Sequence, residues 1–132
     1  MSLKNWDNKT WLSSTSYIKS FNKFLIKEIK LNKNSEILDI GCGRGKILGN
    51  LTSKLRLANK PIGIDIERHK DRDKRIIFNK TDAINYLKKN RKKFDLILLK
   101  QTIHFLPLKD IKKLLLLCIN SLNFGGPVSY TH

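Results

Sequence analysis

The most constraining feature of this 132-residue chain is a short apolar segment that runs directly into a cluster of glycines. Residues Ile37–Ile40 (ILDI) are apolar apart from Asp39, and the next five residues read GCGRG. A short apolar run that ends in glycines is typical of a buried strand followed by a tight turn. Apolar residues at helical spacing then predict a helix over residues 46–57. A strand, glycine turn and helix in this order favour an α/β fold.

The same alternation continues along the chain. Further strands are expected at residues 62–66, 75–79 and 94–99, and further helices at residues 82–90 and 109–122. The segment 94–99 (FDLILL) is almost wholly apolar, as a parallel strand covered on both faces should be. Before the first strand, apolar residues three and four apart predict an amphipathic helix from Tyr17 to near Lys30. The expected fold is a leading helix and the first half of a doubly wound, mainly parallel sheet, with strands one to four present.

The length fits one domain. We expect an N-terminal helical cap segment at residues 1–34, a core at residues 35–126, and a truncated or non-native tail at residues 127–132. Two observations support the last expectation: the apolar fourth strand would form an exposed sheet edge, and VSYTH, the final five residues, also matches one translated frame of a common transposase-type sequencing adapter. The chain is therefore expected to be a C-terminally truncated fragment, which need not be active by itself.

Composition leaves two interpretations of the charge open. The net charge is +16, with 27 Lys and Arg against 11 Asp and Glu. Such an excess is typical of RNA- or DNA-binding proteins, but the abundance of Lys, Asn and Ile is also what AT-rich codons produce. No stretch approaches the roughly 20 apolar residues of a membrane helix. We therefore expect no membrane segment. Cys42 and Cys118 show neither metal-ligand spacing nor a disulfide framework, so we also expect no metal site and a reduced cytoplasmic setting.

The spacing of the glycines separates two kinds of nucleotide-binding turn. A dinucleotide fingerprint, G-x-G-x-x-G, would need its third glycine at position 46, which is Lys46. The third glycine comes one residue earlier, at Gly45. No G-x-x-x-x-G-K-[ST] sequence is present, which excludes a P-loop. Peptide N–H groups at the start of the following helix favour an anion or carboxylate of a bound ligand.

From Glu36 to Gly126 the chain resembles the class I S-adenosylmethionine (SAM)-dependent methyltransferases, which have a Rossmann-like fold. The segments that carry the resemblance are, in order, ILDIGCGRGKIL, IGIDIE, NKTDA, FDLILLKQTIHFLP and LNFGG. Residues 103–106 (IHFL) stand where many small-molecule methyltransferases have a similar segment. The resemblance implies SAM as cofactor and a small-molecule acceptor. The alternatives are an RNA (rRNA or tRNA) methyltransferase that uses the basic surface, and a non-catalytic SAM-fold or nucleic-acid-binding module.

The resemblance also implies a set of cofactor-binding residues: Asp39, Gly41, Cys42, Gly43, Gly45, Asp65, Ile66, Asp82, Ala83, Lys100 and Gln101. The glycines form the floor beneath SAM, and Asp39 orders the turn and helps to hold the amino-acid end. Asp65, at the end of the second strand, accepts hydrogen bonds from both ribose hydroxyls. The other residues contact the adenine (Ile66, Asp82, Ala83) and the methyl-donor end (Lys100, Gln101).

Several of these residues also have ordinary structural explanations. Asp82 could cap the following helix, bind adenine, or do both. Asp95, at the amino end of its strand, is expected to be structural. His104 is a weak candidate for the catalytic base, and a packing or helix-capping role is the alternative. Trp6, Trp11 and Tyr17 of the N-terminal segment are expected to help build the acceptor pocket.

Overall fold

The computed structural model describes residues 15–99, 106–123 and 128–130. Each expected strand and helix is present, with ends within two residues of the expected bounds. The elements are α2 (Thr15–Ile29), β1 (Ile37–Ile40), α3 (Lys46–Leu55), β2 (Ile62–Asp65), β3 (Ile77–Lys80), α4 (Ala83–Lys89), β4 (Leu96–Leu99), α5 (Leu108–Asn120) and β5 (Val128–Tyr130).

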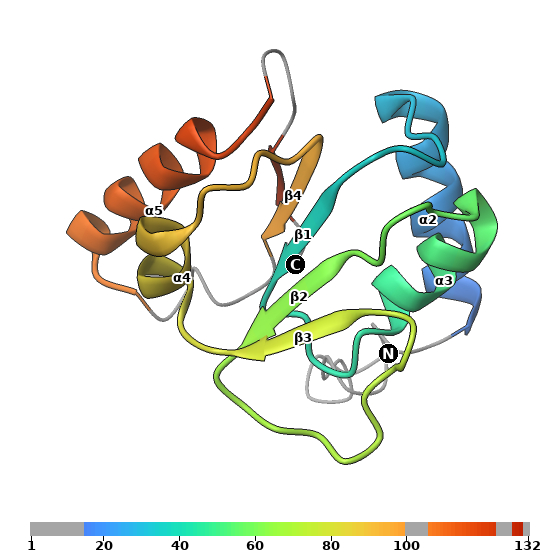
Figure 1. The fold of residues 1–132 in the computed structure, drawn as a ribbon, viewed down its shortest axis with the longest axis horizontal. Helices are drawn as coiled ribbons and strands as arrows, with labels where there is room; N and C mark the ends of the chain where they lie inside the picture. The colour runs from blue at the N-terminus through green and yellow to red at the C-terminus, as the bar shows by residue number, and fades with distance from the viewer. Residues whose placement is uncertain (1–14, 100–105, 124–127, 131–132) are drawn as a thin grey trace, which may run out of the picture.

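The strands form one parallel sheet in the order β3-β2-β1-β4-β5 (Figure 1). β1 is central and pairs with β2 on one side and β4 on the other. The chain builds outward from β1 to β3 and then crosses back to β4, so the strand order reverses between β1 and β4. In sheets of this kind ligands bind at the carboxyl ends of the strands beside that reversal. The predicted Rossmann-like α/β fold is confirmed.

We expected four strands with β4 at one edge of the sheet, but the structure has a fifth strand beyond β4. Val128–Tyr130 forms β5 and pairs in parallel with Ile97–Leu99. Three residues are too short for a strand to be identified from periodicity, and this strand is defined by its backbone pairing with β4. β4 is therefore an interior strand of the sheet, which agrees with its wholly apolar and buried sequence.

The core has two layers, because helices cover both faces of the sheet (Figure 1). Alternate residues of a strand point to opposite faces. On the α2 and α3 side the strands β1 and β4 contribute Ile37, Leu96 and Leu98. On the α4 and α5 side they contribute Leu38, Ile40, Ile97 and Leu99. In the described part of the chain, no helix has the length and apolar character that crossing a membrane requires.

Candidate functional site

The turn after β1 depends on glycine at three positions. Gly41, Gly43 and Gly45 have φ angles of 77°, 56° and 78°, in the left-handed region that other residues enter at a cost of about 1–2 kcal/mol each. The N–H groups of Gly41 and Cys42 both donate to the Ile64 carbonyl, at 2.9 and 3.0 Å. The turn is thus fastened by its backbone to β2, and α3 begins directly after Gly45.

Gly43 and Gly45 differ in what surrounds them. A Cβ atom at Gly45 would lie 2.6 Å from the Ile76 Cδ1 atom, so this glycine is needed for close packing against the loop that precedes β3. A Cβ atom at Gly43 would meet no atom within 4 Å. Gly43 therefore faces open space, and a ligand could approach its backbone there.

Asp65, the last residue of β2, reaches across to this turn. Its Oδ2 accepts the N–H of Gly43 at 2.8 Å, and its Oδ1 accepts the N–H of Glu67 at 3.1 Å. A carboxylate oxygen can accept two hydrogen bonds, so each oxygen keeps a second acceptor position. The side chain is half-buried. The backbone thus orients a carboxylate beside the open face of Gly43.

Two further predicted cofactor residues lie at this end of the sheet. Asp39 is fully buried in β1, and its backbone is paired with Gly63 on one side and Leu98 on the other. Ile66 follows Asp65, and 61% of its side chain is exposed, which is high for a large apolar residue. An exposed isoleucine next to an oriented carboxylate offers an apolar surface against which a ring can pack.

Asp82 has the helix-capping role that was one of its two predicted roles. Its Oδ1 accepts the N–H of Asn85 at 2.8 Å, and its backbone is extended (φ −82°, ψ 158°), as at an N-cap. The side chain is exposed, so capping does not enclose it. Ala83 is the first residue of α4. The adenine contacts predicted for these two residues stay predictions.

Asp95 is structural, as expected, and lies at the opposite end of the sheet from the glycine turn. Its Oδ2 accepts the N–H of Glu36 at 2.7 Å, and its Oδ1 accepts from the Asn123 side chain at 2.8 Å. These bonds join the starts of β1 and β4 to the end of α5. Tyr17 stacks on Phe21 in α2, with ring centres 5.9 Å apart, and burial raises its pKa. The other predicted site residues, namely Trp6, Trp11, Lys100, Gln101 and His104, lie outside the described residues.

The two cysteines are both buried, and neither forms a disulfide. Cys42 packs against β2, where a Cβ atom at Gly63 would lie 2.8 Å from its Sγ, which explains a glycine inside that strand. Burial raises the pKa of Cys118 to about 12. Among the described residues no group of His, Cys, Asp and Glu side chains could hold a metal ion.

The loop between β2 and β3, residues 66–76, holds groups that we did not predict from the sequence. Arg72 donates to the Glu67 carbonyl at 2.7 Å and to the Cys42 Sγ at 3.4 Å. Its guanidinium carbon lies 3.4 Å from the centre of the Phe78 ring. Arg72 therefore ties the loop to the glycine turn. The density of basic residues over positions 68–75 was the available signal.

A parallel sheet of this order, a left-handed glycine turn after the central strand and an acid at the end of the adjacent strand are features of Rossmann-like nucleotide-binding folds, which include the class I SAM-dependent methyltransferases. The sequence model of a methyltransferase domain family matches residues 31–129 of the chain. The chain belongs to this methyltransferase domain family, and the resemblance found in the sequence is confirmed.

Individual relatives agree with this assignment. An uncharacterized methyltransferase of Schizosaccharomyces pombe is 33% identical over 60 residues, which are 46% of this chain and 22% of that protein. The N-methyltransferase NodS from Bradyrhizobium japonicum WM9, in complex with S-adenosylhomocysteine, is 19% identical with a TM-score of 0.70, over 95% of this chain and 64% of NodS. A SAM-dependent methyltransferase from Archaeoglobus fulgidus is 29% identical with a TM-score of 0.59, over 80% of this chain and 48% of that protein. The chain thus spans less than two thirds of each of these relatives.

Proposed function

We propose that this chain binds SAM and that the protein it represents transfers the methyl group of SAM to a small-molecule acceptor. The observation that carries the proposal is the hydrogen bond between Gly43 N–H and Asp65 Oδ2 at 2.8 Å. It fixes a carboxylate beside an open glycine turn, which suits a ligand that brings two neighbouring hydroxyl donors. The relatives described above, one of which holds S-adenosylhomocysteine, support the same cofactor.

Described residues suit the amino-acid, ribose and adenine parts of SAM. Gly43 leaves room above the turn, and N–H groups at the start of α3 suit the carboxylate of the amino-acid end. Asp65 keeps acceptor positions for the ribose, and the exposed Ile66 provides a face for the adenine. Asp39, Gly41, Cys42, Gly45, Asp82, Ala83, Lys100 and Gln101 complete the proposed set.

Methyl transfer asks little acid–base chemistry of the protein. SAM, when bound, supplies a methyl group on an already activated sulfonium. The chain has to hold the cofactor and the acceptor in line and exclude water, and at most one base takes a proton from the acceptor. His104 is our only candidate for that base.

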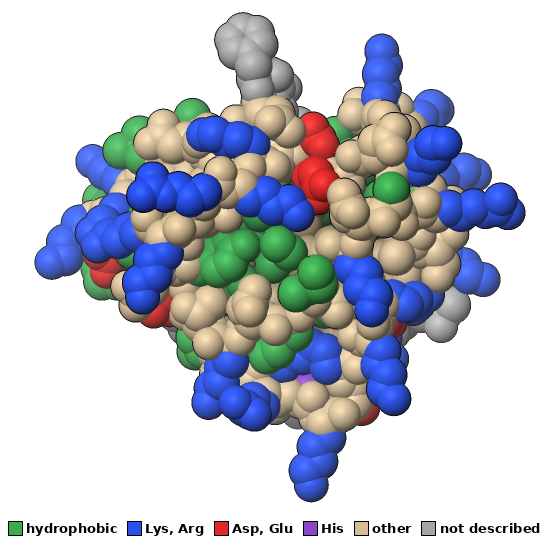
Figure 2. Space-filling view, viewed as in Figure 1, with side chains coloured by type: hydrophobic (Ala, Val, Ile, Leu, Met, Phe, Trp, Pro, Cys, Tyr) green, Lys and Arg blue, Asp and Glu red, His purple; other side chains and the backbone are tan. Residues whose placement is uncertain are grey.

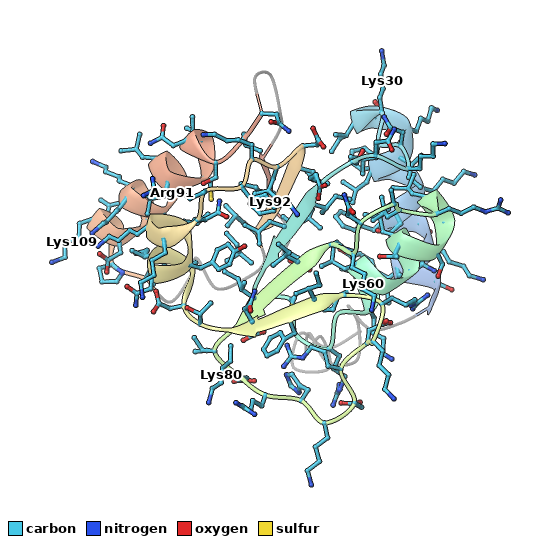
Figure 3. The ribbon with its side chains drawn as sticks, viewed as in Figure 1. Lys30, Lys60, Lys80, Arg91, Lys92 and Lys109 are labelled. Atoms are coloured by element: carbon cyan, nitrogen blue, oxygen red, sulfur yellow. The ribbon has the colours of Figure 1, made fainter. Side chains whose placement is uncertain are left out.

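The distribution of charge favours a small-molecule acceptor over RNA. On the face that Figure 2 shows, Lys and Arg side chains lie mainly around the margin, with a hydrophobic patch near the centre, and do not form one continuous track. The labelled cations in Figure 3 come from different elements around the molecule: Lys30, Lys60, Lys80, Arg91, Lys92 and Lys109. A continuous basic track is the usual sign of an RNA-binding surface. The similarity of residues 103–106 to small-molecule methyltransferases supports the same choice. A reduced cytoplasmic setting, consistent with two cysteines that form no disulfide, is part of the proposal.

Calorimetric titration of SAM into the wild type and Asp65→Ala tests the cofactor assignment. Loss of two charge-assisted hydrogen bonds, each worth about 1.5 kcal/mol or more, should weaken binding by at least tenfold. Asp110→Ala removes the same charge on α5 and should leave the affinity unchanged. Circular dichroism of each variant checks that it is folded. Equal affinities of wild type and Asp65→Ala would refute the assignment, as would a preference for NAD over SAM.

The acceptor class is tested on the same protein by salt dependence. An RNA methyltransferase should bind RNA with an affinity that falls steeply between about 50 and 200 mM salt. A small-molecule methyltransferase should bind RNA no more tightly than it binds a nucleoside monophosphate. If the protein binds SAM but methylates neither small molecules nor RNA, the result would favour the alternative of a non-catalytic SAM-fold module.

A further inference from the structure

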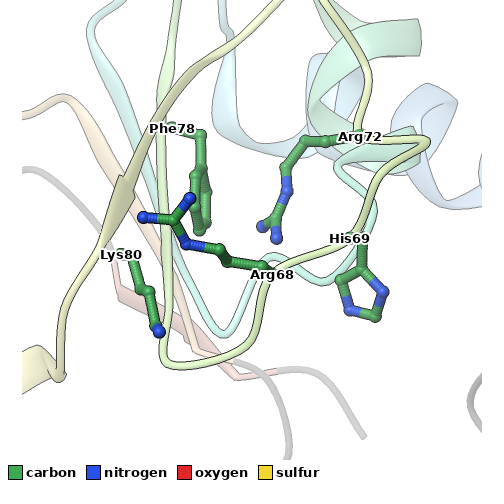
Figure 4. Close-up of a pocket in the computed structure, with 5 residues that line it drawn as sticks. All are labelled: Arg68, His69, Arg72, Phe78 and Lys80. Atoms are coloured by element: carbon green, nitrogen blue, oxygen red, sulfur yellow. The ribbon is translucent and has the colours of Figure 1, made fainter.

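A separate pocket lies beside the proposed cofactor site, between the β2–β3 loop and β3. Its volume is about 290 Å³, and it is lined by Arg68, His69, Arg72, Phe78 and Lys80 (Figure 4). None of these residues belongs to the proposed SAM-binding set. The pocket nevertheless adjoins that set, because Lys80 is the direct cross-strand neighbour of Asp65.

The residues that line the pocket are rich in cationic side chains, and none of them is acidic. They include two arginines, one lysine and one histidine. Two nearby acids are paired with cations outside the pocket, Asp71 with Arg44 and Asp73 with Arg75, and Glu67 lies 3.7 Å from the lining residue His69. Within the described part of the chain, the side chains of Arg68 and Lys80 form no hydrogen bond or ion pair. Cations that converge on a concave surface in this way attract an anion.

Arg72 gives the pocket one cation in a fixed position. Its contacts with the Glu67 carbonyl, the Cys42 thiol and the Phe78 ring hold the guanidinium in place. A guanidinium has five N–H donors, so two internal hydrogen bonds leave donors for a ligand. Phe78 is half-buried and provides the apolar floor on which Arg72 is stacked.

We propose that this pocket is a phosphate-binding subsite for a phosphorylated ligand. A phosphate monoester carries a charge of about −1.5 to −2 and three acceptor oxygens at neutral pH, which matches several converging cations better than the single charge of a carboxylate does. Arginine forks suit phosphate oxygens in particular. The phosphate belongs to a small molecule or to a nucleic acid. Both present phosphate oxygens to the cations, and a backbone phosphodiester differs from a monoester in carrying a single charge and two unesterified oxygens.

Titration calorimetry at low salt tests the subsite, with inorganic phosphate, a nucleoside monophosphate and a short single-stranded RNA as probes and acetate as the control anion. The test variant is Arg68→Gln with Lys80→Gln. The matched control is Lys19→Gln with Lys23→Gln, which removes the same charge from the exposed face of α2. We expect the test variant to bind phosphate at least tenfold more weakly than the wild type does, and the control to bind it as the wild type does. SAM affinity should stay within twofold in both.

The outcomes separate this proposal from the proposed function. Failure of the wild type to bind phosphate, equal losses in both double variants, or acetate bound as tightly as phosphate would each overturn the subsite, whatever the SAM titration shows. If the wild type binds RNA much more tightly than the monophosphate and the test variant loses that difference, the result supports the subsite with a nucleic acid as the source of the phosphate. Equal affinity for the monophosphate and RNA supports it with a small-molecule source.

Discussion

The glycine turn and the β2–β3 loop adjoin each other at the same end of the sheet, but they are held in place by different means. In the turn, backbone N–H groups donate to the Ile64 carbonyl, and three glycines take left-handed φ angles. In the loop, side chains make most of the connections: Arg72 contacts Glu67 and Cys42, Arg44 pairs with Asp71, and Arg75 pairs with Asp73. One backbone hydrogen bond, from the Asp73 N–H to the Arg44 carbonyl at 2.8 Å, also joins the loop to the turn.

The difference has a consequence for function. A turn built from backbone atoms keeps its shape as long as its glycines are present, which suits the binding of an invariant cofactor. A loop held by side chains changes its shape and charge whenever one of those side chains is replaced. We therefore infer that the turn determines what cofactor the protein binds and that the loop determines what else binds beside it.

The largest expected effect comes from breaking the turn. Gly45→Ala combines a left-handed φ of 78° with a Cβ that would lie 2.6 Å from the Ile76 Cδ1 atom. Backbone strain and overpacking together should lower the free energy of unfolding by about 3 kcal/mol, measured by urea denaturation. Gly43→Ala has the strain but not the collision, and should cost about 1 kcal/mol.

The two variants should have the opposite order in SAM binding: Gly43→Ala should weaken it more than Gly45→Ala does. The added methyl group of Gly43→Ala would occupy the open face of the turn, so SAM affinity should fall although the protein stays folded. Equal stabilities of the two variants would contradict the packing role of Gly45. Unchanged SAM binding by Gly43→Ala would contradict the open face as the cofactor side.

A smaller effect is expected from cutting the link between the two regions. Arg72→Met keeps an apolar side chain over Phe78 but removes both hydrogen bonds and the cation. Thermal unfolding should show a loss of about 1–2 kcal/mol. Hydrogen exchange of the loop amides should speed up more than that of β1. Equal acceleration in both would show that the two regions are one cooperative unit.

The smallest effect concerns Asp73, and it depends on pH. Its hydrogen bonds with Arg75 lower its pKa, so the folded state favours the carboxylate. This contribution to stability is present above the ordinary Asp pKa of about 3.9 and is lost as the pH falls through the lowered folded value. Asp73→Asn should cost about 1 kcal/mol at pH 6, and the difference from wild type should shrink toward pH 3. A difference that stays constant over this range would show that the ion pair contributes nothing.

The sheet and the glycine turn could be predicted because their signals are local. Short segments carry these signals: the apolar run before Gly41 indicates a strand, Lys46 identifies the type of glycine turn, and the acid at residue 65 marks the end of the second strand. The pocket could not be predicted, because it depends on which cations of the loop face Phe78 and Lys80. Similarly, the strand Val128–Tyr130 is defined by pairing with a segment about 30 residues earlier in the chain.

By itself the sequence determined the order of strands and helices, the glycine turn and the family, since apolar periodicity and glycine spacing are properties of neighbouring residues. Only the tertiary structure decided that Gly43 N–H binds the carboxylate of Asp65, that Gly45 and Gly63 make room for Ile76 and Cys42, and that uncompensated cations converge on one pocket. The physical reason is that these contacts join segments distant in the chain. Their geometry is set by how the strands and loops pack, and no local pattern records it.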